Sequence, residues 1–181
     1  MKNFFKFLTI TLLAVTVSCS SDDDAGSSVD NNSIEGTFRL TSFVTQTSYD
    51  LDGDGDSSND LLIETDCYQN QTLTFNEGNN GFFTSTSFLN ISVDVEIING
   101  DETYTQTVNC ETENDITSFT WQRNGDGVII STGSQNGAIS SDFNSDGSLT
   151  FTISQGFIAE IVEGEGTATV TEDVVATYVR I

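Results

Sequence analysis

The sequence predicts an all-β domain: an antiparallel up-and-down meander of about 8–10 strands that closes into a barrel. Three observations support this fold class. Apolar residues recur at every second position in run after run, which is the period of strands with one buried face. Segments rich in Gly, Asn and Asp separate these runs, and the chain of 181 residues contains no proline. No segment after residue 18 shows a helical period.

The alternation can be followed from residue 34 to the end of the chain. Its clearest run is ISVDVEI, in which Ser92, Asp94 and Glu96 share one face and the aliphatic residues share the other. The residues that share a face within each run are Phe38, Leu40 and Val44; Leu73 and Phe75; Ile91, Val93, Val95 and Ile97; Tyr104, Val108 and Cys110; Phe119 and Trp121; Leu149, Phe151 and Ile153; and Val174, Ala176, Tyr178 and Arg180. The bulky residues expected to face the barrel interior are Phe38, Leu73, Phe75, Val93, Val95, Phe119, Trp121, Phe151 and Tyr178.

The connections between these runs are short and consist of residues that favour tight turns. NEGNNG, NGD, NGDG and SDG each stand between two successive runs. Asn-Gly and Asp-Gly tolerate the positive φ angles that hairpin turns require. Short connections make neighbouring strands antiparallel, and closure of the meander leaves no unpaired edge. A two-sheet β-sandwich is the alternative architecture.

Residues 1–18 have the organisation of a secretory signal peptide. Lys2 and Lys6 provide the basic flank, an apolar run follows, and small residues precede Cys19. The alternative is a permanent membrane anchor, but the apolar run is shorter than the roughly 20 residues that a spanning helix needs.

The sequence TVSC resembles a bacterial lipobox, in which the cysteine is acylated and becomes the new N-terminus. The SSDDD that follows is similar to the acidic export tag of surface lipoproteins in the Bacteroidetes group. We therefore expect Cys19 to carry the lipid and to anchor the protein in the outer membrane, facing the cell exterior. Residues 19–33 then form a flexible acidic tether, and residues 34–181 form the barrel domain.

The charge balance narrows the partners that this protein can have. The formal net charge is -23, with 28 acidic residues and only 5 basic ones. Such a chain is repelled by nucleic acid and by anionic lipid, and its field favours neutral or cationic ligands. The chain has no histidine and both of its lysines lie in the signal peptide, so no such residue is left to activate a nucleophile. We therefore expect a non-catalytic protein, and we favour a monomer.

Two cysteines remain in the domain once Cys19 is assigned to the lipid. Cys67 and Cys110 form an even pair in an oxidising compartment, which favours a disulfide over two free buried thiols. Closing the loop between them would stabilise the fold by roughly 4 kcal/mol in the chain-entropy model.

The segment DLDGDGDSSNDLLIE, residues 50–64, is dense in like charges that repel one another. Aspartates at alternate positions followed by Gly55 match the first half of a calcium loop, and a hard cation would turn their repulsion into attraction. The twelfth position is Leu61, where an EF-hand has its bidentate glutamate, so a later carboxylate has to complete the shell. The candidate ligands are Asp50, Asp52, Asp54, Asp56, Asp60 and Glu64. A solvated acidic turn is the alternative interpretation.

Four features occur in an order that resembles the lipocalin-like domain of Bacteroidetes lipoproteins. They are IEGTFRLTSF, the paired cysteines, FTWQRNGDGVII and the terminal ATYVRI. In lipocalins a Gly-x-Trp on the first strand packs under an arginine of the last strand, and the resemblance places Phe38 and Arg180 at these positions. A closed barrel of this kind has an interior that can hold one small ligand, and we expect an apolar or sugar-like one. A filled barrel that serves as a surface interaction module is the alternative.

Overall fold

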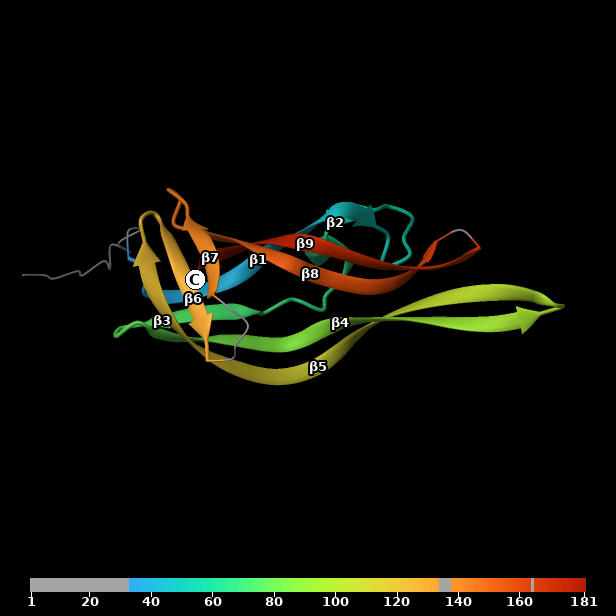
Figure 1. Ribbon diagram of the computed structural model, residues 1–181, viewed down its shortest axis with the longest axis horizontal. Coiled ribbons are helices and arrows are strands. Elements are labelled where there is room, and N and C mark those ends of the chain that lie inside the picture. The colour runs from blue at the N-terminus through green and yellow to red at the C-terminus, as the bar shows by residue number, and fades with distance from the viewer. Residues whose placement is uncertain (1–32, 134–137, 164) are drawn as a thin grey trace, which may run out of the picture.

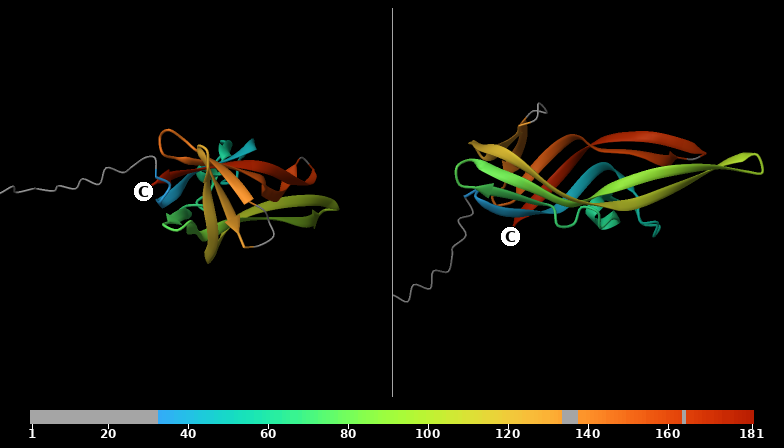
Figure 2. Two further views of the ribbon diagram at one scale, coloured as in Figure 1. Left: turned by 60° about the vertical axis from the view of Figure 1, so that its left-hand side comes forward. Right: turned by 90° about the horizontal axis from the view of Figure 1, so that it is seen from below.

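The computed structural model describes residues 33–133, 138–163 and 165–181, which form a closed antiparallel barrel with two long projections (Figure 1; Figure 2). The predictions for residues 1–18, for Cys19 and for the tether up to residue 32 lie outside the described residues. Within the described residues, no helix is long and apolar enough to cross a membrane.

The described chain contains nine strands and one short helix. The elements are β1 (Gly36–Tyr49), β2 (Ser58–Asp60), α1 (Leu61–Glu64), β3 (Thr72–Asn76), β4 (Asn80–Ile98), β5 (Asp101–Asn124), β6 (Gly127–Thr132), β7 (Ala138–Phe143), β8 (Leu149–Glu163) and β9 (Gly166–Arg180). From β3 to β9 each strand pairs antiparallel with the next, and β1 pairs with both β3 and β9. Closure through β1 and β9 makes an eight-stranded barrel with β2 as an extra strand on β1, which confirms the predicted meander and excludes the sandwich.

The predicted turns are confirmed, whereas α1 was not expected. Each of the four turn sequences joins two consecutive strands, and the Asn99-Gly100 pair has φ angles of 57° and 97°. Helix α1 has only four residues, too few to show a helical period in the sequence. It begins at Leu61, directly after the N-cap residue Asp60, whose side chain accepts the Leu62 N–H at 3.1 Å.

Aromatic side chains fill the end of the barrel that holds the C-terminus, which we call the base. The Phe75 ring meets those of Phe38, Phe119 and Trp121 in edge contacts, with centroids 5.6, 5.3 and 5.7 Å away. The indole N–H of Trp121 donates to the carbonyl of Asn80 at 3.0 Å, so the polar atom of this ring is satisfied. Of the residues predicted to face inward, all are buried except Val93 and Val95.

Arg180 closes the base beneath Phe38, as the lipocalin resemblance implies. Its guanidinium lies 4.7 Å from the centre of the fully buried Phe38 ring and donates to the carbonyls of Ser33 and Glu35. Gly36 has a φ of 133°, and a Cβ at this position would lie 2.4 Å from Arg180 Nη1. The chain therefore needs glycine where β1 passes over the arginine.

Two hairpins continue past the barrel as two-stranded ribbons (Figure 1). Beyond Thr84, β4 pairs with β5 alone among the described residues, and beyond Phe151, β8 pairs with β9 alone. This explains the error for Val93 and Val95: they lie on the β4–β5 ribbon, past the closed barrel, and Val95 is 53% exposed.

The predicted disulfide between Cys67 and Cys110 is confirmed, with Cα atoms 4.8 Å apart. Cys67 is fully buried after α1, whereas Cys110 lies on the exposed part of β5. The bridge therefore ties the segment that precedes β3 to the start of the β4–β5 ribbon.

Candidate functional site

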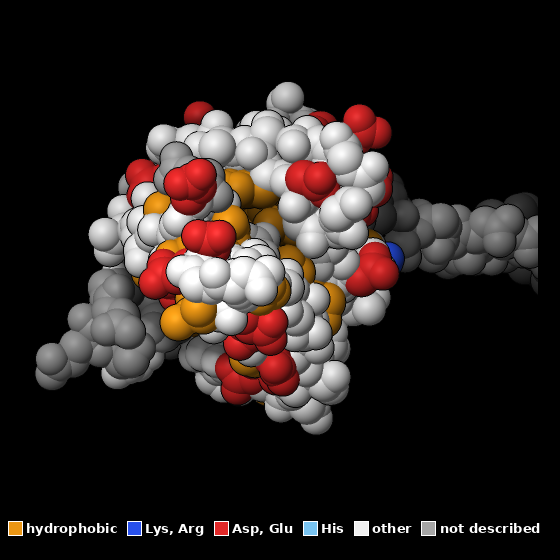
Figure 3. Space-filling model, turned by 90° about the vertical axis from the view of Figure 1, so that its right-hand side faces the viewer, with side chains coloured by type: hydrophobic (Ala, Val, Ile, Leu, Met, Phe, Trp, Pro, Cys, Tyr) orange, Lys and Arg blue, Asp and Glu red, His pale blue; other side chains and the backbone are white. Residues whose placement is uncertain are grey.

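A cleft of about 330 Å³ opens between β4 and β8, where the two ribbons leave the barrel. It is lined by Tyr68, Phe88, Leu89, Asn90, Ile91, Gly156, Phe157, Ile158 and Ala159. Phe157 and Ala159 are buried members of the core, and Leu89 and Ile91 pack against that core while remaining partly exposed. The floor of the cleft is thus the edge of the hydrophobic core. Figure 3, which looks at the ribbon ends, shows apolar side chains in a hollow among polar and acidic ones.

A backbone irregularity interrupts β8 beside this floor. The β8–β9 register shifts between Ile153 and Phe157, and Gln155 in this bulge has a φ of 53°. Between these two pairs β8 advances four residues while β9 advances two, so the inward alternation of β8 stays in phase. Phe157 and Ala159 are therefore buried on the ribbon side of the shift, as Leu149 and Phe151 are on the barrel side.

Two tyrosines support the cleft from β1 and from the segment before β3. Burial raises the pKa of Tyr68 to about 12, although a hydrogen bond with the Leu89 backbone lowers it somewhat, and the Tyr68 ring packs 4.8 Å from that of Phe43. Burial, together with a hydrogen bond to Glu172, raises the pKa of Tyr49 to about 12, and its ring lies 5.2 Å from that of Phe157. Both phenols are therefore neutral at physiological pH, so they add no charge to the apolar wall.

Glu172 on β9 fixes the end of β1 behind this wall. Its Oε2 accepts the N–H groups of Gln46 and Thr47 at 2.7 and 3.0 Å, and its Oε1 accepts the Tyr49 hydroxyl at 2.7 Å. Desolvation by burial raises the pKa of Glu172, but the hydrogen bonds from Thr47, Tyr49 and Gln46 outweigh it, and the pKa lies below its ordinary value. The ionised carboxylate is thus the form that the fold stabilises.

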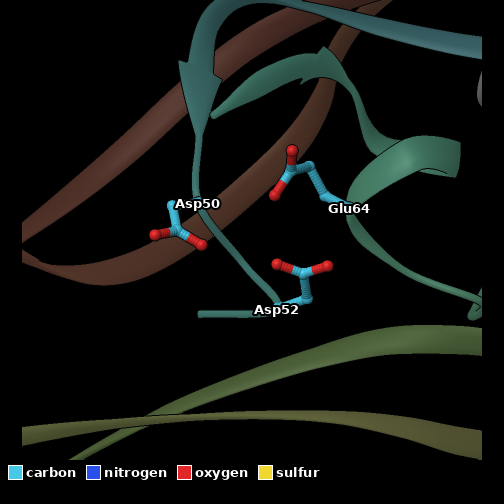
Figure 4. Close-up of side chains that lie close together, drawn as sticks. All are labelled: Asp50, Asp52 and Glu64. Carbon is cyan, nitrogen blue, oxygen red and sulfur yellow. The ribbon is translucent and has the colours of Figure 1, made fainter. Parts of the chain in front are cut away.

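The acidic segment forms a separate cluster at the end of β1. Asp50, Asp52 and Glu64 each direct a carboxylate oxygen to one point, within 4.8 Å of one another (Figure 4). Glu64 is buried on α1, and its Oε2 accepts the Leu51 N–H at 3.0 Å. Asp50 accepts the N–H groups of Gly53 and Gly55 at 2.8 and 3.1 Å, which curls the loop around the cluster.

The other three candidate ligands lie outside this cluster. Asp54 is exposed and accepts the N–H of Asp56, which is exposed as well, at 2.8 Å. Asp60 uses its carboxylate within the fold: besides capping α1, it accepts the Ser42 hydroxyl at 2.7 Å and the Phe43 N–H at 3.0 Å. These contacts give Asp60 a structural role in place of the predicted role as a ligand.

The three clustered carboxylates suit a hard divalent cation. Calcium prefers oxygen ligands, and the loop provides carboxylates and backbone carbonyls without any lysine or arginine between residues 50 and 64. The residues present therefore fit the group that the sequence predicts, with Glu64 in place of the missing glutamate at the twelfth loop position.

The sequence interpretation missed the residues of the cleft. Phe157, Ala159 and Ile161 alternate along β8, but this short pattern follows the bulge and was not read as part of a strand. Glu172 gave no signal in an acidic chain, because its partners on β1 lie more than a hundred residues away.

A scan against protein-family models found no match to this chain, and a search of curated proteins found none either.

Proposed function

We propose that this protein is a non-catalytic binding protein whose site is the cleft between β4 and β8. The observation that supports this proposal is that the cleft reaches the core: Leu89, Ile91, Phe157 and Ala159 line it, and polar atoms make up most of the surface that it exposes. Ligand sites are concave and combine apolar side chains with polar groups that orient the ligand. The Asn90 amide is such a group in the lining.

The volume and charge of the cleft define the ligand class. A volume of about 330 Å³ stands at the lower end of the range for small-molecule sites, so the ligand is small. The acidic chain disfavours anions, including fatty acids, and favours neutral or cationic molecules. We therefore propose an apolar or sugar-like ligand without negative charge.

The proposed setting of this activity is the outer face of the outer membrane, with the lipid on Cys19. The basis is the signal peptide, the cysteine and the acidic tag in the sequence. Replacing Cys19 with alanine should release the protein from the membrane fraction or leave the signal peptide uncleaved. Unchanged fractionation of the Cys19→Ala variant would refute the lipid anchor.

A pair of fluorescent naphthylamine dyes can test the cleft. Neutral N-phenyl-1-naphthylamine should bind with a saturable rise in emission, and its anionic sulfonate analogue should bind more weakly. Ile91→Trp, which places a bulky indole ring in the cleft, should abolish the saturable rise in dye emission. The matched control is Ile116→Trp, because Ile116 is 61% exposed on β5 and does not line the cleft. Equal dye binding by the wild type and by both variants would contradict the proposal.

The filled base favours the second candidate, a surface interaction module without a small ligand. Phe38, Phe75 and Leu149 are at most 2% exposed, so side chains fill the barrel interior at the base. If the wild type binds neither dye, the cleft holds no small ligand and this second function remains.

A further inference from the structure

The outer half of the β4–β5 ribbon has an amphipathic character that the cleft does not use. Val93, Val95 and Ile97 lie on one face of β4, and Tyr104 lies opposite Val95 on β5 and shares that face. Val95 is 53% exposed and Ile97 is 75% exposed. Exposed aliphatic side chains in a row on a protruding strand are typical of an interaction surface.

The same segment of β4 has an unpaired edge. Among the described residues, β4 from Ser92 to Ile98 pairs with β5 alone, so its other edge carries backbone N–H and C=O groups without a neighbouring strand. Such an edge is a template for the addition of another strand, with main-chain hydrogen bonds providing the affinity.

The negative charge of the ribbon indicates which kind of polypeptide strand could pair with the free edge of β4. Asp94 and Glu96 are exposed on the face opposite the aliphatic row, and the turn that follows adds Asp101. The ribbon from residue 85 to residue 118 contains no basic residue. The arginines of the domain lie at the base, at the start of β1, the end of β5 and the end of β9.

We propose that the free edge of β4 binds an extended polypeptide in which apolar and basic residues alternate. Side chains of an added strand alternate between the two faces with the same period as those of β4. One set of its side chains therefore lies beside Val93, Val95 and Ile97, and the other set lies beside Asp94 and Glu96. Aliphatic residues match the first face and lysine or arginine matches the second.

Charge excludes the two nearest alternative occupants. A second copy would place its own Asp94 and Glu96 beside those of the first, and like charges on neighbouring strands are destabilising. The segment of residues 19–33 contains four aspartates and no basic residue, so it is repelled by the ribbon as well. The occupant is therefore a different, basic polypeptide.

The test uses the whole domain and synthetic peptides labelled with fluorescein. A peptide of alternating valine and lysine should bind with saturable fluorescence polarisation, more weakly as the salt concentration rises. A peptide of the same composition, with all lysines in one block, should bind at least about tenfold more weakly, because two cross-strand charge pairs and the apolar row are lost. Equal binding of the two peptides would mean non-specific charge attraction and would overturn the proposal.

Two further measurements test the contacts themselves. Asp94→Asn with Glu96→Gln should weaken binding about tenfold, whereas the control Glu111→Gln with Glu113→Gln, on the inner part of β5, should not. Two alternating peptides, N-methylated on odd or on even residues, should differ strongly, because only one set of N–H groups meets the edge of β4. Equal affinity of both methylated peptides, or equal effects of both double variants, would refute strand addition. The cleft variant Ile158→Trp separates the two sites, because Ile158 lines the cleft from β8 and its replacement should leave binding of the unmethylated alternating peptide unchanged.

Discussion

Glu172 provides a sharp test of how the β8–β9 ribbon is attached to the barrel. The Glu172→Gln variant keeps the size of the side chain but loses its charge and one acceptor oxygen. The wild-type carboxylate accepts three hydrogen bonds, two from the backbone of β1 and one from Tyr49. Hydrogen bonds to charged groups contribute about 1.5–3 kcal/mol each, and solvent screening reduces this at a half-buried site. We expect the free energy of unfolding to fall by about 2 kcal/mol.

The pH dependence follows from the direction of the pKa shift. Because the pKa of Glu172 is lowered in the folded protein, its stabilising contribution is fully present above the unfolded pKa. It is lost as the pH falls through the folded pKa. The difference in unfolding free energy between wild type and Glu172→Gln should therefore be full at pH 7 and should shrink below about pH 4.5, the ordinary value for a glutamate.

Urea unfolding followed by tryptophan fluorescence measures both effects. The control is Glu160→Gln, an exposed carboxylate on the same ribbon, which should change stability by less than about 0.5 kcal/mol. Tyr49→Phe keeps the ring contact with Phe157 but loses the hydroxyl, so we expect a cost of about 1 kcal/mol and non-additivity with Glu172→Gln. A Glu172→Gln penalty that is no larger than the Glu160→Gln penalty, or that is equal at pH 3 and pH 7, would refute this account of the network.

Three other predictions concern the disulfide, the acidic cluster and the packing of the barrel. Replacing the two bridged cysteines, 43 positions apart, with alanine should cost roughly 4 kcal/mol in urea unfolding, and a variant as stable as wild type would contradict this. Millimolar calcium should raise the melting temperature of the wild type and of Asp54→Asn but not that of Asp52→Asn, because of these two aspartates only Asp52 belongs to the cluster. If calcium shifts the melting temperature of none of the three proteins, the acidic segment is a solvated turn that binds no calcium. Gly81→Ala should destabilise the barrel by about 1–3 kcal/mol, because its Cβ would lie 2.3 Å from the carbonyl of Thr74, whereas Gly133→Ala meets nothing within 4 Å. Equal melting temperatures for these two alanine variants would refute the packing argument.

The fold was accessible from the sequence because strand alternation and turn chemistry are local signals. Residues such as Phe38, Phe75 and Tyr178 were placed in the core correctly. The same alternation failed for Val95, because it tells which side chains share a face but not whether another strand covers that face. Coverage depends on the lengths of β3, β6 and β7, which end before the ribbons begin.

The acidic segment shows a similar division between local and tertiary information. Its composition predicts a cluster of carboxylates, and the structure gathers Asp50, Asp52 and Glu64. Which carboxylates join was not readable, because α1 turns Glu64 towards the loop and directs Asp60 to Ser42 on β1. Both outcomes depend on a helix too short to be seen in the sequence.

The contact of Arg180 with Ser33 and Glu35 determines how a tethered barrel would be oriented. Since Arg180 holds the entry of the chain at the base, anything that attaches upstream holds the domain by that end. Under the proposed anchoring at Cys19, the 15 residues from 19 to 33 would span at most roughly 50 Å, so the base would face the membrane and the ribbons would point away from it. The cleft and the free edge of β4 would then lie at the end of the domain that is farthest from the anchor and most accessible to partners.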